Sequence, residues 1–118
     1  MNEELKAIFG DHIEVIRDKK EVSIPTAHIV YKGQSDEYVV WTILSNKPEL
    51  CADDEVLYSV YEVDVDIYSK SNYLDIVSKV KSLMKTNLYV WTEDSPEMYE
   101  TETGYYHLTC TFEKERMN

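Results

Sequence analysis

The chain has 118 residues, which is enough for one domain with a hydrophobic core, and we expect that domain to span residues 1–118. Its 23 acidic residues outnumber its 12 basic residues, and the formal net charge of −11 argues against tight nucleic-acid binding and against attraction to an anionic membrane. Hydrophobic residues make up 43% of the chain, which excludes a disordered polymer, and the sequence predicts neither a membrane span nor a signal peptide.

Apolar residues near the N-terminus repeat with a helical period. This pattern predicts an amphipathic helix from about Asn2 to Arg17. Gly10 lies inside that helix and costs about 1 kcal/mol relative to Ala. The alternative is therefore a helix that ends at Gly10, followed by an extended segment from Ile13 to Ile16.

Two strands are predicted next. Thr26–Tyr31 alternates after the extended Ile24-Pro25 pair, and Glu37–Leu44 is rich in β-branched and aromatic residues. Lys32–Asp36 between them has turn composition, so the spacing predicts a hairpin. Ser45–Asp54 contains Pro48 and is predicted to be a loop.

The central stretch changes period once. From Leu57 to Ile67 the apolar residues alternate with polar ones, which predicts a strand with one buried face. From Tyr73 to Met84 the apolar residues follow the helical period instead. Asn72 is the predicted N-cap, with Asp75 three residues on in a capping-box position.

The C-terminal third predicts two more strands. Leu88–Thr92 is short, Glu93–Glu102 is an acidic loop, and Gly104–Phe112 alternates again. The predicted order is α-β-β-β-α-β-β. Because short turns join consecutive strands, this order favours an α+β fold with a mainly antiparallel sheet and its helices packed on one face.

Three carboxylates lie on one face of the central predicted strand: Glu62, Asp64 and Asp66. Such a group can hold Mg²⁺ or Mn²⁺, and neighbouring acids raise one another's pKa, which suits acid–base chemistry. The chain has no glycine-rich phosphate loop to accompany a metal. A solvated or inter-subunit strand face is the ordinary interpretation, and we predict no catalytic, metal or cofactor site.

Histidine, cysteine and tyrosine offer weaker signals. A site of two histidines and one carboxylate would need His28 and His107 on paired strands beside an aspartate. Cys51 and Cys110 form no CxxC pair, so we expect reduced, buried thiols. Ten tyrosines suit sheet faces and interfaces, where a ring is buried while its hydroxyl stays in water.

Three segments together resemble a known family. They are Ile24-Pro25 followed by Tyr31-Lys32-Gly33-Gln34-Ser35 and Tyr38; Val65-Asp66-Ile67-Tyr68-Ser69-Lys70-Ser71-Asn72-Tyr73; and Tyr99-Glu100-Thr101-Glu102-Thr103-Gly104-Tyr105-Tyr106-His107. In this order and spacing they resemble the small tail-terminator, or tail-completion, proteins of the head–tail joining region of long-tailed phages and of prophages in Gram-positive bacteria. The resemblance covers Ile24 to Phe112, and Ser71 stands where that pattern has Gly.

The resemblance implies a structural assembly protein without cofactor or catalysis. Copies would form a homo-hexameric ring in the bacterial cytoplasm, cap the tail tube, join it to the head connector and remain in the virion tail. Glu62, Asp64 and Asp66, or the acidic loop Glu93–Glu102, would then face the lumen or an interface. The candidate interface aromatics are Tyr68, Tyr73, Tyr99 and Tyr105.

Two other functions stay open from the sequence. The charge of −11 and the many aromatics also suit an acidic binding module, such as an immunity or inhibitor protein that masks a basic partner. A metal-dependent enzyme would use the Asp64–Asp66 face. Size-exclusion chromatography with light scattering separates a ring from a monomeric module, and a thermal shift with Mg²⁺ or Mn²⁺ tests the enzyme.

Overall fold

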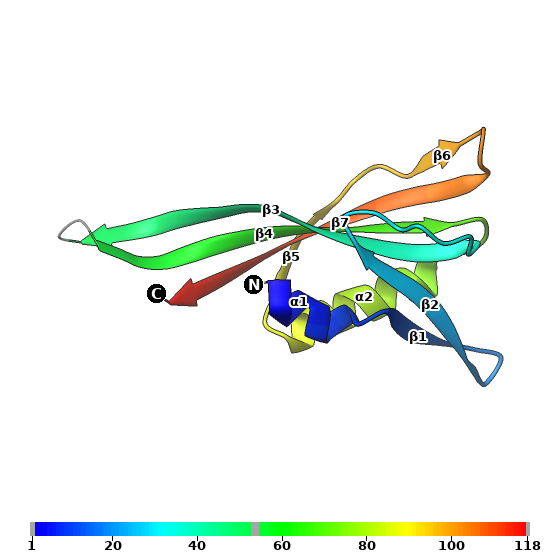
Figure 1. Ribbon diagram of the computed structural model, residues 1–118, viewed down its shortest axis with the longest axis horizontal. Coiled ribbons are helices and arrows are strands. Elements are labelled where there is room, and N and C mark those ends of the chain that lie inside the picture. The colour runs from blue at the N-terminus through cyan, green and yellow to red at the C-terminus, as the bar shows by residue number, and fades with distance from the viewer. Residues whose placement is uncertain (1, 53–54, 118) are drawn as a thin grey trace.

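The computed structural model describes residues 2–52 and 55–117, which form an α+β domain with two helices and a seven-stranded sheet (Figure 1). The elements in chain order are α1 (Asn2–Phe9), β1 (His12–Arg17), β2 (Lys20–His28), β3 (Glu37–Ala52), β4 (Glu55–Ser69), α2 (Leu74–Thr86), β5 (Val90–Asp94), β6 (Met98–Glu100) and β7 (Tyr105–Met117).

The sheet is mixed rather than antiparallel throughout. Its strand order is β1-β2-β3-β4-β7-β5, with β6 on the other end of β7. The predicted hairpin between Thr26–Tyr31 and Glu37–Leu44 is wrong, because β2 pairs with β3 in parallel. β2 instead forms its hairpin with β1, through a turn in which Asp18 and Lys19 both have positive φ. The chain must therefore cross over before it returns as β3.

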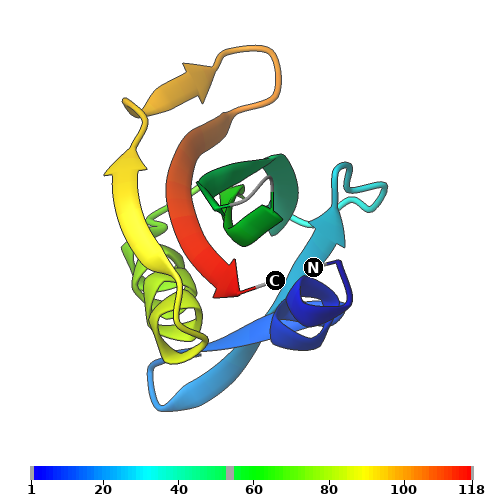
Figure 2. The ribbon, with the colours of Figure 1, turned by 90° about the vertical axis from the view of Figure 1, so that its left-hand side faces the viewer.

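The sheet curls around its helices, as the end-on view shows (Figure 2). Residues that alternate along β3, β4 and β7 face both helices and form the core with them. The fully buried strand side chains include Val39, Trp41, Val63, Val65, Cys110 and Phe112, and the helices contribute Leu5, Phe9, Ile76, Val80 and Met84. The predicted buried faces of the central strand and of the second helix are thereby confirmed.

Helix α2 connects the two ends of the curled sheet. The Arg17 guanidinium at the end of β1 donates to the Asp75 carboxylate of α2 through Nε, at 2.6 Å, and through Nη2, at 3.0 Å. Its Nη1 also donates to Glu37 of β3 at 2.7 Å. On the other side, Lys81 of α2 donates to Asp94 of β5 at 3.0 Å. Ion pairs thus tie α2 to both terminal strands of the sheet.

Local predictions failed at the N-terminus and at the helix cap. The first helix ends at Phe9, because Gly10 takes a φ of 59° and the chain continues as β1, which is the alternative that the sequence left open. The N-cap of α2 is Tyr73, not Asn72. The Asn72 side-chain oxygen accepts a hydrogen bond from the Leu74 N–H at 3.1 Å, and the Asp75 carboxylate accepts hydrogen bonds from Arg17.

The predicted loop Ser45–Asp54 is mostly strand. β3 runs through Pro48 to Ala52 and pairs with β4 along a long hairpin, while residues 53 and 54 lie outside the described chain. Proline is tolerated because this part of β3 is a sheet edge, since β2 pairs only with Val39–Trp41. The acidic loop Glu93–Glu102 likewise contains β6, which pairs with β7.

Candidate interaction surface

One face of the sheet carries no helix of the described chain, and it holds the predicted acidic residues. Register places Asp64 of β4 opposite Thr111 of β7 and Asp66 opposite Thr109. Because Val63, Val65 and Ile67 point into the core, the even-numbered residues of β4 point to the opposite side. We call this side the helix-free face.

Asp66 is held by two neighbours on β7. Its Oδ1 accepts a hydrogen bond from the Thr109 hydroxyl at 2.5 Å and lies 2.9 Å from His107 Nε2. Burial by itself would raise the pKa of Asp66, but the contacts with His107 and Thr109 outweigh it and hold that pKa below its usual range. Asp66 is therefore a stably charged, half-buried carboxylate.

Asp64 has the opposite electrostatic character. Burial raises its pKa, and the neighbouring carboxylates of Asp66 and Glu62 add to the rise. The Thr111 hydroxyl donates to Asp64 Oδ1 at 2.6 Å and opposes the shift without cancelling it. Glu62 accepts a weak hydrogen bond from the Ser45 hydroxyl at 3.5 Å. The acids thus form a bonded ladder with threonine and serine rather than a freely solvated strip.

Aromatic rings continue the same face towards the other end of β4. Tyr31, Tyr38, Tyr68 and His107 stack in succession, with ring centroids 4.4, 4.6 and 4.1 Å apart. Tyr105 meets Tyr68 edge-on at 6.3 Å, and its hydroxyl donates to the Ser35 carbonyl at 2.5 Å. Burial raises the pKa of Tyr68 to about 12, so its hydroxyl stays protonated. Two predicted interface aromatics, Tyr68 and Tyr105, therefore belong to one cluster.

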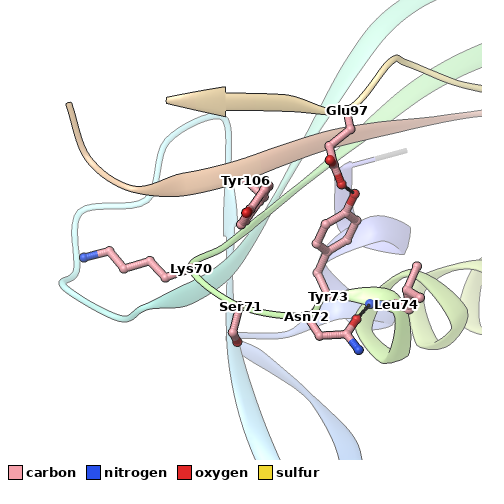
Figure 3. Close-up of a pocket in the computed structure, with 7 residues that line it drawn as sticks. All are labelled: Lys70, Ser71, Asn72, Tyr73, Leu74, Glu97 and Tyr106. Atoms are coloured by element: carbon pink, nitrogen blue, oxygen red, sulfur yellow. Dashed lines mark hydrogen bonds between the residues drawn. The ribbon is translucent and has the colours of Figure 1, made fainter. Parts of the chain in front are cut away.

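The other two predicted aromatics lie on the opposite side of the sheet. Tyr73 and Tyr106 border an open hollow of about 500 Å³ at the corner between β4 and α2 (Figure 3). The Tyr73 hydroxyl donates to the Glu97 carboxylate across this hollow, and Tyr99 packs on Tyr106 with centroids 4.9 Å apart. The four predicted aromatics therefore do not share one surface.

The two histidines considered for a metal site lie on different sides of the sheet. His28 stacks on Trp41 at 3.9 Å, on the core side, whereas His107 lies on the helix-free face. A site of two histidines and one carboxylate is therefore not assembled from them. Within residues 2–52 and 55–117, no group of three or more histidine, cysteine, aspartate or glutamate side chains could hold a metal ion.

The cysteines differ in what can be said of them. Cys110 is free and buried, and burial raises the pKa of its thiol to about 12, which makes it unreactive. Cys51 lies in β3, and its side chain is outside the described residues.

The sequence did not reveal two exposed apolar patches. Leu88, Val90 and Trp91 precede or lie on β5 and are 75%, 64% and 51% exposed. Ile29 and Val30 follow β2 and are 64% and 56% exposed. Apolar residues in strand-like runs are normally assigned to the core, so only tertiary structure identifies them as surface.

No protein-family model matches the chain, and no curated protein matches it significantly. None of the helices in the described residues is long and apolar enough to cross a membrane.

Proposed function

We propose that this protein is a structural assembly protein of a phage or prophage tail, of the tail-terminator type. It caps the tail tube in a ring of identical copies, six as the resemblance implies, and joins the tube to the head connector. The sequence segments that resemble this family span most of the domain, from Ile24 to Phe112.

The observation that carries the proposal is the β3–β4 hairpin, which extends well beyond the helices (Figure 1). A compact chain of this length has a radius of gyration of about 13–14 Å. The observed value is 15.7 Å, and the molecule measures 54 × 31 × 23 Å. β7 pairs with β4 from Tyr58 to Ser69, so only the tip of the hairpin beyond Tyr58 is a two-stranded ribbon. Because a two-stranded ribbon is marginally stable alone in water, this tip suits a protein whose arm rests on a neighbour.

The acidic helix-free face suits a DNA passage. A ring of six copies would carry 6 × (−11) = −66 formal charges. We place Glu62, Asp64 and Asp66 towards the lumen, where carboxylates repel phosphates and let DNA slide. Glu62→Lys with Asp64→Lys leaves the Asp66 contacts intact and should slow DNA passage. Unchanged DNA delivery by virions that contain this variant would contradict the lumen assignment.

Deletion of the gene in the bacterium that encodes it tests the function. We expect induced particles to show separate heads and tails of irregular length by electron microscopy, and we expect the wild-type gene supplied in trans to restore joined virions. A gene encoding the protein without the outer half of the hairpin should fail to restore them. Normal joined virions in the deletion strain would refute the proposed function.

A further inference from the structure

Two exposed apolar residues of this protein adopt a left-handed backbone. Ile29 and Leu88 both have a φ of 70°, and their side chains are 64% and 75% exposed. A residue with a side chain pays about 1–2 kcal/mol for this conformation, and a β-branched one such as Ile is a clear outlier. Both side chains are mostly exposed, so burial does not offset this strain, and the fold alone does not explain why these positions are apolar.

Leu88 occupies a position where glycine is strongly preferred. The Leu88 N–H donates to the Lys85 carbonyl at 3.0 Å, and the Tyr89 N–H donates to the Met84 carbonyl at 2.9 Å. These two bonds form a Schellman motif at the end of α2, with Leu88 at the C′ position. The exposed Leu88 lines one hollow together with Val90, whereas Trp91, the next residue on β5, points to the other side of the strand, where Lys81 lies over its ring. We call Leu88 and Val90 the β5 flank.

Ile29 ends the pairing of β2 with β3. Its N–H donates to the Trp41 carbonyl at 3.0 Å, and the chain then turns away from β3. The turn leaves β3 from Thr42 onwards without a partner on that edge among the described strands. Ile29 and Val30 stand exposed where this open edge begins, and we call them the crossover flank.

The two flanks lie on opposite sides of the central hairpin. β2 is the second strand of the sheet and β5 is the last, and Figure 2 shows them to either side of β3 and β4. A contact between two different patches on opposite sides of one chain is heterologous, and repetition of such a contact closes a ring or grows a filament. Two separate apolar patches on opposite sides match this requirement.

One exposed charge near each flank is opposite in sign to one near the other. Lys32 follows the crossover flank and Glu93 lies on β5, and both side chains are exposed with no ion pair in the described structure. Two copies that each carry −11 repel one another in most orientations. Docking one flank on the other brings a lysine of one copy towards a glutamate of the next.

We propose that the β5 flank of one copy docks on the crossover flank of the next, with β5 added beside the open edge of β3. The partner is thus a second copy of this chain. This inference rests on the proposed function, because it names the contact that would build the tail-capping ring. An exposed strand edge flanked by apolar side chains is a common acceptor for such an added strand.

A mixing experiment tests the proposal. The β5-flank variant carries Leu88→Asp with Val90→Asp, and the crossover-flank variant carries Ile29→Asp with Val30→Asp. Aspartate tolerates a positive φ better than leucine or isoleucine, so neither Leu88→Asp nor Ile29→Asp adds backbone strain. Light scattering after size exclusion gives the mass of each protein alone and of an equimolar mixture.

The wild type should self-associate at about 100 µM, where a contact with a Kd of about 1 µM is nearly saturated. Each variant alone should be monomeric, with association weakened about 30-fold or more, as for loss of an interface hot spot. The mixture should form a 1:1 dimer and nothing larger, because each variant contributes one intact flank. A variant with two added charges on α2, Leu74→Asp with Ser82→Asp, should associate like the wild type.

The proposal would be overturned by a wild type that stays monomeric at about 100 µM, by flank variants that associate like the wild type, or by a mixture that forms no dimer. Equal loss of association in the α2 control would overturn it as well, because added charge alone would then explain the effect. The gene-deletion experiment is independent of these results. Disordered tails in the deletion strain together with a monomeric wild type would leave the proposed function standing and refute this contact.

Discussion

The backbone at Leu88 makes a prediction that reverses the usual ranking of two residues. Alanine is ordinarily the better residue near a helix and glycine costs about 1 kcal/mol more. At Leu88 the φ of 70° penalises every residue that has a Cβ, by about 1–2 kcal/mol. We therefore expect Leu88→Gly to be more stable than Leu88→Ala by about 1 kcal/mol, after glycine's larger loss of backbone entropy is subtracted.

The absolute change at Leu88 should be small. The side chain is 75% exposed, so its removal loses about a quarter of the 1.5–3 kcal/mol that complete burial of a leucine contributes. For Leu88→Gly this loss of about 0.5 kcal/mol, together with about 0.5–1 kcal/mol of entropy, is offset by the relieved strain. The free energy of unfolding of Leu88→Gly should therefore lie within about 1 kcal/mol of the wild-type value.

Leu74 provides the matched control. It is 65% exposed but is the first residue of α2, where the backbone is helical. Leu74→Ala should therefore be more stable than Leu74→Gly, the reverse of the order at Leu88. Urea unfolding monitored by circular dichroism measures all four variants. With an m-value of about 1–2 kcal/mol/M, a difference of 1 kcal/mol moves the midpoint by about 0.5–1 M. An alanine variant at Leu88 as stable as the glycine variant would refute the strain argument.

The remaining predictions concern charge and the second strained residue. Asp66→Asn should lower the free energy of unfolding by about 1–2 kcal/mol at neutral pH, since charged hydrogen bonds are lost. Because the pKa of Asp66 is lowered in the folded protein, its contribution is present above the unfolded value near 4 and is lost as the pH falls through the folded value, so the wild type and Asp66→Asn should converge in urea titrations at low pH. Because the pKa of Asp64 is raised in the folded protein, its contribution to stability is present at low pH and is lost as the pH rises through the folded value. Asp64→Asn should therefore leave the free energy of unfolding at pH 7 nearly unchanged or raise it. A destabilisation as large as that of Asp66→Asn would contradict this. Arg17→Lys should cost about 1 kcal/mol or more in the same assay, because lysine cannot bind a carboxylate through two parallel hydrogen bonds, and an unchanged midpoint would show that α2 is held without this pair. Ile29→Asn should raise the free energy of unfolding by about 0.5–1 kcal/mol while it weakens self-association. If stability and self-association both rose or both fell, the idea that Ile29 is strained for the sake of docking would be contradicted.

Much of the local structure of this chain was determined by periodicity alone. The alternation from Leu57 to Ile67 and the helical spacing after Tyr73 identified β4 and α2 with their buried sides, because a strand and a helix each bury residues at a fixed interval. The three carboxylates were correctly placed together on the side of β4 away from the core. These features depend on neighbours in sequence, so the sequence was sufficient to predict them.

Tertiary structure decided which strands pair and which apolar residues stay in water. β2 forms its hairpin with β1 rather than with β3, so β2 and β3 pair in parallel. Asp64 and Asp66 look equivalent in sequence, yet their pKa values shift in opposite directions because His107 reaches only Asp66. Leu88 and Ile29 resemble core residues, and only the path of the backbone places them outside. Pairing and exposure depend on residues distant in the chain, whose positions no local pattern contains.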